Sequence, residues 1–164
     1  MDAIIMKIGD KFAIEGESTI DGHAKEIDLI SVDHAITLPV TFDTSGNSRT
    51  RGRSQHGDII VAKYLDKASA KLLEACSKGI DLGKVQLYYA RTLEGTTEIF
   101  WQVELTDVYV SSVKNSSKRG EDLPHEVVTL NYTSIKWTYN LFNNQGTKDG
   151  SVSAGWDLAQ NKAA

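Results

Sequence analysis

The amino-acid sequence predicts a mainly β protein: an antiparallel β-barrel with one short α-helix packed on its side and a long exposed loop. Three observations support this prediction. Apolar and polar residues alternate over several long runs, two of these runs change phase partway, and only one segment has the period of a helix. Alternation with a period of two is typical of strands with one buried face, and paired bends in long strands let a sheet curl into a barrel.

The clearest strands lie in the second half of the chain, where apolar residues alternate over 85–89, 99–105 and 128–132. The second run resumes one position out of step at Val108, and the third resumes out of step at Ile135. A slip of one residue would exchange the two faces of a strand. We therefore expect a bulge or a sharp bend near Thr106–Asp107 and another near Thr133–Ser134.

One segment has the pattern of a helix of about eleven residues, too short to be stable alone. Asp66 is a favourable N-cap, Lys78 suits the negative end of the helix dipole, and Gly79 suits the left-handed position after the last turn. The apolar face that should dock on the sheet consists of Ala68, Leu72, Ala75 and Cys76.

Turn residues and one long polar segment separate these elements. Turns are expected at Asp21-Gly22, Glu94-Gly95 and Asp149-Gly150. The segment from Thr41 to Gly57 is rich in Gly, Ser and Arg, and it predicts a long exposed loop. Loops of that length are usually functional or disordered.

Length and composition fit one soluble domain that spans residues 1–164. Hydrophobic residues make up 40% of the chain and charged residues 24%, with a net charge of -4 at pH 7. An acidic balance disfavours a general nucleic-acid binder. Cys76 is the one cysteine, so no intrachain disulfide is expected. The N-terminus lacks the pattern of a cleaved signal peptide, and we expect no membrane insertion because no apolar run approaches about 20 residues.

The residues of common catalytic and metal sites do not form a recognisable pattern. The four histidines lack zinc-site spacing, so no metal or other cofactor is expected. Gly16-Glu17-Ser18 lacks the second glycine of a nucleophile elbow and is interpreted as a turn. No glycine-rich phosphate loop is present. We therefore expect a protein that is not an enzyme.

Short blocks along most of the chain resemble the hemolysin-coregulated proteins, the Hcp family, which form the inner tube of the bacterial type VI secretion system. No single block is specific, but their order and spacing together are. They are KIGD at 7–10, IEGES at 14–18, HAKEID at 23–28, KYLDKAS at 63–69, ACSKG at 75–79, VSSV at 110–113, GED at 120–122, VTLNY at 128–132 and AGWD at 154–157.

The resemblance implies a barrel with one helix on its side, six copies in a ring with a wide channel, and rings stacked into a tube. It also implies that a contracting sheath expels the tube. The further partners would be spike and baseplate proteins, and effector proteins in the lumen. The chain would fold in the bacterial cytoplasm and leave the cell without a cleaved signal peptide. The chain ends soon after Trp156, so we expect no added toxin domain.

Two groups of residues are the candidate functional positions. In the segment from Ile27 to His34, alternation places Ser31 and Asp33 on the face opposite Ile30 and Val32. We expect the apolar pair in the core and the polar pair on the channel wall, where it would touch effectors; the resemblance adds that this strand lies near the lumen. Arg49, Arg51 and Arg53 form a basic cluster in the long loop. We expect these arginines to contact an acidic surface on the next ring or on cargo.

Three alternatives remain open at this point. A small-ligand-binding β-barrel carrier would enclose its ligand and need not form a ring. An enzyme could assemble a site from scattered carboxylates and histidines. A phage tail-tube protein would follow the same logic of stacked rings, although the blocks above favour the secretion-system family.

Overall fold

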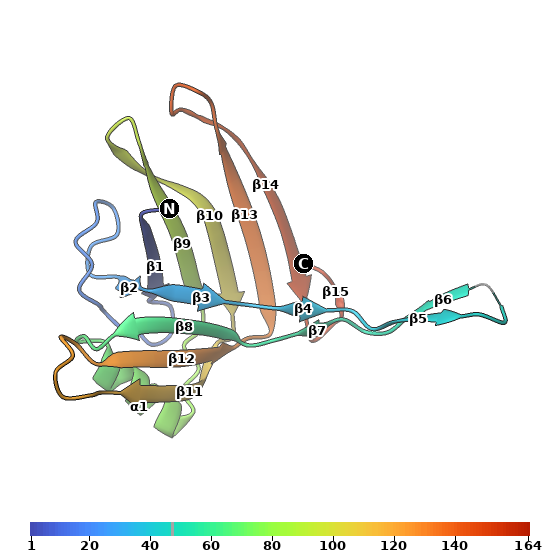
Figure 1. The fold of residues 1–164 in the computed structure, drawn as a ribbon, viewed down its shortest axis with the longest axis horizontal. Coiled ribbons are helices and arrows are strands. Elements are labelled where there is room, and N and C mark those ends of the chain that lie inside the picture. The colour runs from blue at the N-terminus through green and yellow to red at the C-terminus, as the bar shows by residue number, and fades with distance from the viewer. Residues whose placement is uncertain (47) are drawn as a thin grey trace.

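The computed structural model describes residues 1–46 and 48–164 and shows two antiparallel sheets, one helix and a projecting β-ribbon (Figure 1). This confirms the predicted fold class, which was mainly β and antiparallel with one short helix. Within the described residues, the helix is too short to cross a membrane.

The larger sheet has seven strands in the order β15-β14-β13-β10-β9-β1-β2. Its strands are β1 (Ala3–Ile8), β2 (Ile27–Leu29), β9 (Val85–Leu93), β10 (Thr96–Thr106), β13 (Ser134–Phe142), β14 (Lys148–Asp157) and β15 (Lys162–Ala163). The smaller sheet has four strands in the order β11-β12-β8-β3. Its strands are β3 (Ser31–Asp33), β8 (Ile59–Tyr64), β11 (Tyr109–Ser116) and β12 (His125–Asn131).

Two sharp bends carry the chain from one sheet to the other, at the two positions where the apolar alternation slips. β10 of the larger sheet ends at Thr106, and β11 of the smaller sheet begins at Tyr109. β12 ends at Asn131, and β13 begins at Ser134 in the larger sheet. Asp107 adopts a positive φ of 51°, which turns the chain abruptly. Both predicted bends are therefore confirmed, as corners between two sheets.

A third crossing, between β2 and β3, overturns one prediction from the sequence. Ile30 lies at the junction, its backbone N–H donates to the carbonyl oxygen of Ala62 at 2.7 Å, and its side chain is exposed. The strand slips there, so Leu29 and Val32 pack against the core instead. The prediction that Ile30 faces the core is wrong because a crossing between sheets breaks the alternation of a continuous strand.

The hydrophobic core lies between the sheets and under the helix α1 (Ser69–Lys78). Leu72 and Ala75 are fully buried there, as predicted, and Gly79 ends the helix with φ 62° and ψ 46°. The N-cap prediction needs correction, because the N-cap is Ala68 rather than Asp66. The Asp66 carboxylate instead accepts the Ala68 N–H at 2.9 Å and so closes the turn that precedes the helix.

Two of the predicted turns illustrate how glycine is used in this sheet. Glu94 and Gly95 both have positive φ, 50° and 80°, which is the geometry of a two-residue hairpin between β9 and β10. The turn predicted at Asp149-Gly150 is wrong, because both residues lie within β14. Gly150, with φ 112°, lies beside an irregularity in the pairing of β13 with β14. The chain reverses earlier, at Asn143–Gly146.

Candidate functional site

The four-stranded sheet has one face in the core and one face in solvent. Val32, Val61 and Val128 point into the core. Ser31 pairs with Ala62, and Asp33 pairs with Ile60, so these residues share the opposite face. We call this the outer face; its members include Ser31, Asp33, Ile60, Ala62, Val127 and Thr129, together with Ser112 and Lys114 on β11. Asp33 is exposed and Ser31 is partly exposed, so the two predicted channel residues lie together on a surface of small, polar and aliphatic side chains.

Both edges of this sheet are strands with a single partner among the described residues. β3 pairs with β8, and β11 pairs with β12. Part of the β11 edge is covered where Asp81 bridges to Tyr109 and the Leu82 N–H donates to the carbonyl oxygen of Val108 at 2.8 Å. An edge strand with unpaired N–H and C=O groups is a ready template for pairing with a strand of another chain.

The predicted exposed loop is an ordered β-ribbon, which we call the arm. It comprises residues 35–46 and 48–57, with β4 (Ile36–Thr37) paired to β7 (Gln55–His56) and β5 (Val40–Asp43) paired to β6 (Ser48–Arg51). Position 47, which the loop prediction included, lies outside the described residues. The segment is exposed as predicted, but it is a strand pair rather than an irregular loop. The alternation of Ile36, Leu38, Val40 and Phe42 was the signal for this strand in the sequence.

The two faces of the arm differ in chemistry. Val40 lies opposite Arg51, and Phe42 lies opposite Arg49, so one face is both apolar and cationic. The other face carries hydroxyls and one carboxylate, with Thr41 opposite Thr50 and Asp43 opposite Ser48. Val40 is 52% exposed and Phe42 is 58% exposed, so this apolar surface is not buried within the chain.

Arg53, the third member of the predicted cluster, has a different environment from Arg49 and Arg51. Its guanidinium donates to the carbonyl oxygen of Leu158 at 2.5 Å. Arg53 thus ties the base of the arm to the C-terminal segment, whereas the other two arginines extend from the free ribbon. Sequence spacing alone could not separate them, because it does not show where the arm leaves the body.

A hydrogen-bonded clamp holds the base of the arm to the body. The Tyr132 hydroxyl donates to the carbonyl oxygen of Gly57 at 3.0 Å and lies 2.7 Å from Nε2 of His34. A hydroxyl has one proton, so His34 must be the donor in its bond with Tyr132. Burial, and then the charge of Asp58, raise the pKa of Tyr132 to about 12, so the hydroxyl keeps its proton at neutral pH.

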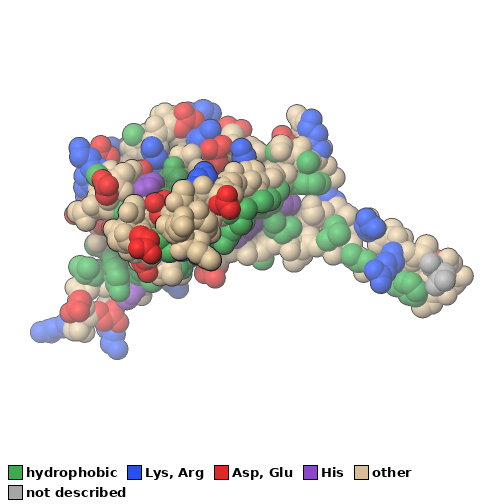
Figure 2. Space-filling model, turned by 90° about the horizontal axis from the view of Figure 1, so that it is seen from above, with side chains coloured by type: hydrophobic (Ala, Val, Ile, Leu, Met, Phe, Trp, Pro, Cys, Tyr) green, Lys and Arg blue, Asp and Glu red, His purple; other side chains and the backbone are tan. Residues whose placement is uncertain are grey.

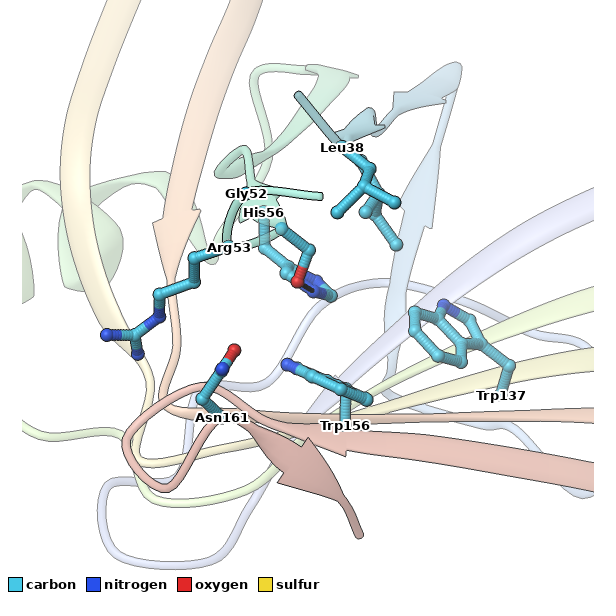
Figure 3. Close-up of a pocket in the computed structure, with 9 residues that line it drawn as sticks. Leu38, Gly52, Arg53, His56, Trp137, Trp156 and Asn161 are labelled. Carbon is cyan, nitrogen blue, oxygen red and sulfur yellow. Dashed lines mark hydrogen bonds between the residues drawn. The ribbon is translucent and has the colours of Figure 1, made fainter. Parts of the chain in front are cut away.

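A cavity of about 410 Å³ opens beside this clamp, between the arm and the strands β13 and β14 (Figure 3). Trp137 and Trp156 form one wall, and Leu38 and His56 face them from the arm. The His56 ring is nearly parallel to Trp156, with ring centroids 6.2 Å apart, and its Nδ1 is buried without a hydrogen-bond partner among the residues that the structure describes. Burial lowers the pKa of His56; burial and then the charge of His56 lower the pKa of His34.

The structure offers little support for catalytic chemistry. Among residues 1–46 and 48–164, no three His, Cys, Asp or Glu side chains are grouped so that they could hold a metal ion. Ser18 is buried, and its hydroxyl accepts the Ile20 N–H at 3.4 Å. Gly16 is needed for packing, because a Cβ there would lie 2.4 Å from the backbone oxygen of Glu26, too close for any other residue. The turn predicted at Gly16-Glu17-Ser18 is wrong, because the segment lies alongside residues 25–26: the Gly16 N–H donates to the carbonyl oxygen of Lys25 at 2.8 Å, and the Ser18 N–H donates to that of Glu26 at 2.9 Å.

Comparisons with known proteins give one consistent family. Residues 5–139 match the family described as "Type VI secretion system effector, Hcp". The chain is 32% identical to "Protein hcp1" of Pseudomonas aeruginosa over 163 residues, 98% of each chain. It is 28% identical to the "Major exported protein" of Pseudomonas aeruginosa over 141 residues, 82% of this chain and 80% of that one. A solved "type six secretion system protein" superposes with a TM-score of 0.89 at 27% identity over 99% of both chains.

Proposed function

Because this chain belongs to the Hcp family of type VI secretion system proteins, we propose that six copies form a ring, that rings stack into the inner tube, and that the tube carries effectors out of the cell. The partners would be further copies of this chain, effectors in the lumen, and the sheath, spike and baseplate proteins. The protein would fold in the cytoplasm and act as one structural unit. A structural role, rather than catalysis, agrees with membership in this family of secretion system proteins.

The observation that carries the proposal is the four-stranded sheet, with its solvent-facing outer face and its two edge strands. If β3 of one copy pairs with β11 of the next, six copies form a closed barrel of about 24 strands. Barrels of roughly 16 or more strands leave an open channel. The outer face would line that channel, and its mostly short side chains, with Asp33 and Lys114 as charged groups, would leave room for a folded protein.

Disulfide trapping tests both the edge pairing and the number of copies. In a Cys76→Ala background, Ser31→Cys is combined in turn with Ser112→Cys, Lys114→Cys or Ser116→Cys, which lie on the same outer face as Ser31, because the register across the interface is unknown. At least one pair should give an oxidised ladder of bands that ends at six chains. The single-cysteine variants are the controls. Failure of every pair in a preparation that still contains rings would exclude this interface, and a ladder with a different end point would exclude six copies.

A charge reversal tests the channel role of the outer face. Asp33→Arg should leave the ring mass unchanged but weaken capture of a cognate effector, because an exposed wall charge acts on the partner rather than on the fold. Asp149→Arg, an exposed change at the far end of β14, is the matched control. Undiminished capture by Asp33→Arg rings of normal size would show that Asp33 does not contact cargo.

A further inference from the structure

The cavity between the arm and the larger sheet has the size and the lining of a small-molecule site. Its volume of about 410 Å³ lies within the range of about 300–1,000 Å³ that is usual for such sites. Apolar side chains form most of its surface, with Trp137 and Trp156 on the sheet and Ile36 and Leu38 on the arm. Ile36 is 44% exposed and Leu38 is 48% exposed, so a ligand can enter from solvent. Figure 2 shows the arm projecting from the body, with hydrophobic side chains along it.

Hydrogen bonds hold the walls of the cavity in place. On the arm, the Gly52 N–H donates to the carbonyl oxygen of Pro39 at 2.8 Å. Arg53 crosses from the arm to the body, where its guanidinium donates to the carbonyl oxygen of Leu158. Leu158 is fixed in turn, because its N–H donates to the carbonyl oxygen of Thr133 at 2.9 Å. A site with preformed walls loses little conformational entropy on binding, which favours affinity.

The aromatic rings around the cavity favour a planar aromatic ligand. Trp156 pairs with Ile135 and Trp137 pairs with Ala154 in neighbouring strands, so the two indoles share one face of the sheet. They face Leu38 and His56 across the cavity (Figure 3), and the plane of the His56 ring is inclined by only 12° to that of Trp156. Burial lowers the pKa of His56, so its ring is uncharged at neutral pH. Stacked aromatic rings are stabilised beyond the effect of area burial alone.

Hydrogen-bond donors gather at one end of the cavity. Figure 3 shows the indole nitrogen of Trp156 pointing toward the side chain of Asn161, with the Arg53 guanidinium beyond it. An indole N–H only donates, and a guanidinium has five N–H donors and no acceptor. The bond with Leu158 uses one Arg53 nitrogen, Nη2, which leaves N–H groups for a further acceptor. No carboxylate is among the described residues that line the cavity. This end therefore favours a ligand that carries a carboxylate.

From this lining we propose that the cavity binds a small planar aromatic carboxylate. The ring would lie between the two indoles on one side and Leu38 and His56 on the other. The carboxylate would accept hydrogen bonds from Arg53 and Asn161. Because the lining comes from both the arm and the body, the bound ligand would hold the base of the arm in place. This role goes beyond that of a tube subunit and does not require that rings form.

Isothermal titration calorimetry with 2-naphthoate tests whether the protein binds this class of ligand. A planar acid of this size should bind with a dissociation constant of about 1 mM or tighter. The neutral amide, 2-naphthamide, should bind about tenfold more weakly, because it offers no charged acceptor to the donors. Cyclohexanecarboxylate, which has the acid without the flat ring, should also bind more weakly. Failure of 2-naphthoate to bind at several times that concentration would overturn the proposal, and equal affinities for the acid and the amide would overturn the carboxylate end.

Two apolar residues of the arm locate the binding site. Leu38 lines the cavity, whereas Val40, two residues further along and 52% exposed, is not among the lining residues. Leu38→Asp should weaken binding of 2-naphthoate by about tenfold or more, because it places an ionised carboxylate against the apolar ring. Val40→Asp is the matched control and should bind as wild type does. Undiminished binding by Leu38→Asp, or an equal loss in Val40→Asp, would place the probe elsewhere and overturn the proposed site.

Arg53→Gln separates a direct contact with the ligand from a loosened arm. If Arg53 binds the carboxylate, the variant should lose about tenfold in affinity for 2-naphthoate and keep its affinity for 2-naphthamide. An equal loss for both probes would mean that Arg53 acts only by tying the arm to Leu158, and would overturn its role as a ligand-binding residue.

Titrations at two protein concentrations test whether a second copy of the chain is the occupant instead. An affinity for 2-naphthoate that is the same at both concentrations is the expected result. An affinity that falls as the chain assembles would show that a neighbouring copy fills the cavity, and would overturn the small-molecule site.

Discussion

The backbone N–H of Thr133 donates to the carbonyl oxygen of Thr106 at 3.0 Å, which joins the two corners where the chain passes between the sheets. The Thr133 hydroxyl donates to Oδ2 of Asp107, also at 3.0 Å. Next to this contact Thr106 pairs with Ser134, the last pair between β10 and β13. The two bends therefore lie side by side, and the two sheets separate from each other at this point.

Removing the Thr133 hydroxyl tests how much the contact between the two corners contributes to the stability of the fold. Thr133→Val should lower the free energy of unfolding by about 1 kcal/mol, because its hydrogen bonds are lost while the shape is kept. Urea unfolding measures the change. Thr41→Val, which alters an exposed hydroxyl on the arm, is the control and should be close to neutral. Equal effects of the two variants would show that the contact adds nothing.

These corners show what the sequence reveals of the fold and where it stops. The phase of apolar residues changes at Thr106 and Thr133 because a strand that enters another sheet must present a new face to the core. The same reasoning misplaced Ile30, because β2 and β3 are too short for the slip between them to show against the alternation. Asp66 has the chemistry of an N-cap, but the side chain closes the preceding turn, and local sequence does not distinguish these roles.

The candidate site could be predicted less completely than the fold. Alternation alone places Ser31 and Asp33 on one face, since they lie two residues apart in the same strand. The arm was missed as a strand pair because Gly, Ser and Arg around β6 obscure the alternation of Val40 and Phe42 on β5. The contact between the Tyr64 and His125 rings could not be found from sequence, since these residues meet only through the pairing of β8 with β12.

Two neighbouring leucines on α1 give a matched test of the helix face. Leu72 is fully buried, whereas Leu73 is 39% exposed. Leu72→Asp should destabilise the protein by several kcal/mol, roughly 3–5, because it buries an unpaired charge and removes core packing. Leu73→Asp should change stability by about 0.5 kcal/mol or less. Thermal unfolding measures both, and an unchanged midpoint for Leu72→Asp would refute the assigned face.

A buried ion pair connects the helix to the smaller sheet. Lys63 and Glu126 are both fully buried, with Nζ 2.8 Å from Oε2, and the Ser69 hydroxyl also donates to Oε2 at 2.8 Å. Lys63→Met should cost about 3–5 kcal/mol, because it leaves the Glu126 charge uncompensated. The double variant with Glu126→Leu should recover most of that loss. Denaturant unfolding of both variants measures their stability. A double variant no more stable than Lys63→Met alone would contradict the charge argument.

The histidines at the base of the arm predict a dependence of stability on pH. Burial lowers the pKa of both His34 and His56, so below about pH 6.5, the value in an unfolded chain, the unfolded state binds more protons than the folded state. Their contribution to stability is intact above that pH and is lost as the pH falls below it. The double variant His34→Gln and His56→Phe should therefore lose less stability than wild type between pH 7 and pH 5. Urea titrations at both pH values measure this, and parallel losses would contradict it.

The central claim, a ring whose channel is lined by the outer face, is tested most directly by the mass of the particle in solution. Six subunits of 18.0 kDa correspond to six times that mass, about 108 kDa. Multi-angle light scattering at several concentrations, with negative-stain images of the same sample, should give this mass at the higher concentrations and show a central channel. A particle that stays at 18.0 kDa at every concentration, or an assembly without a channel, would contradict the account.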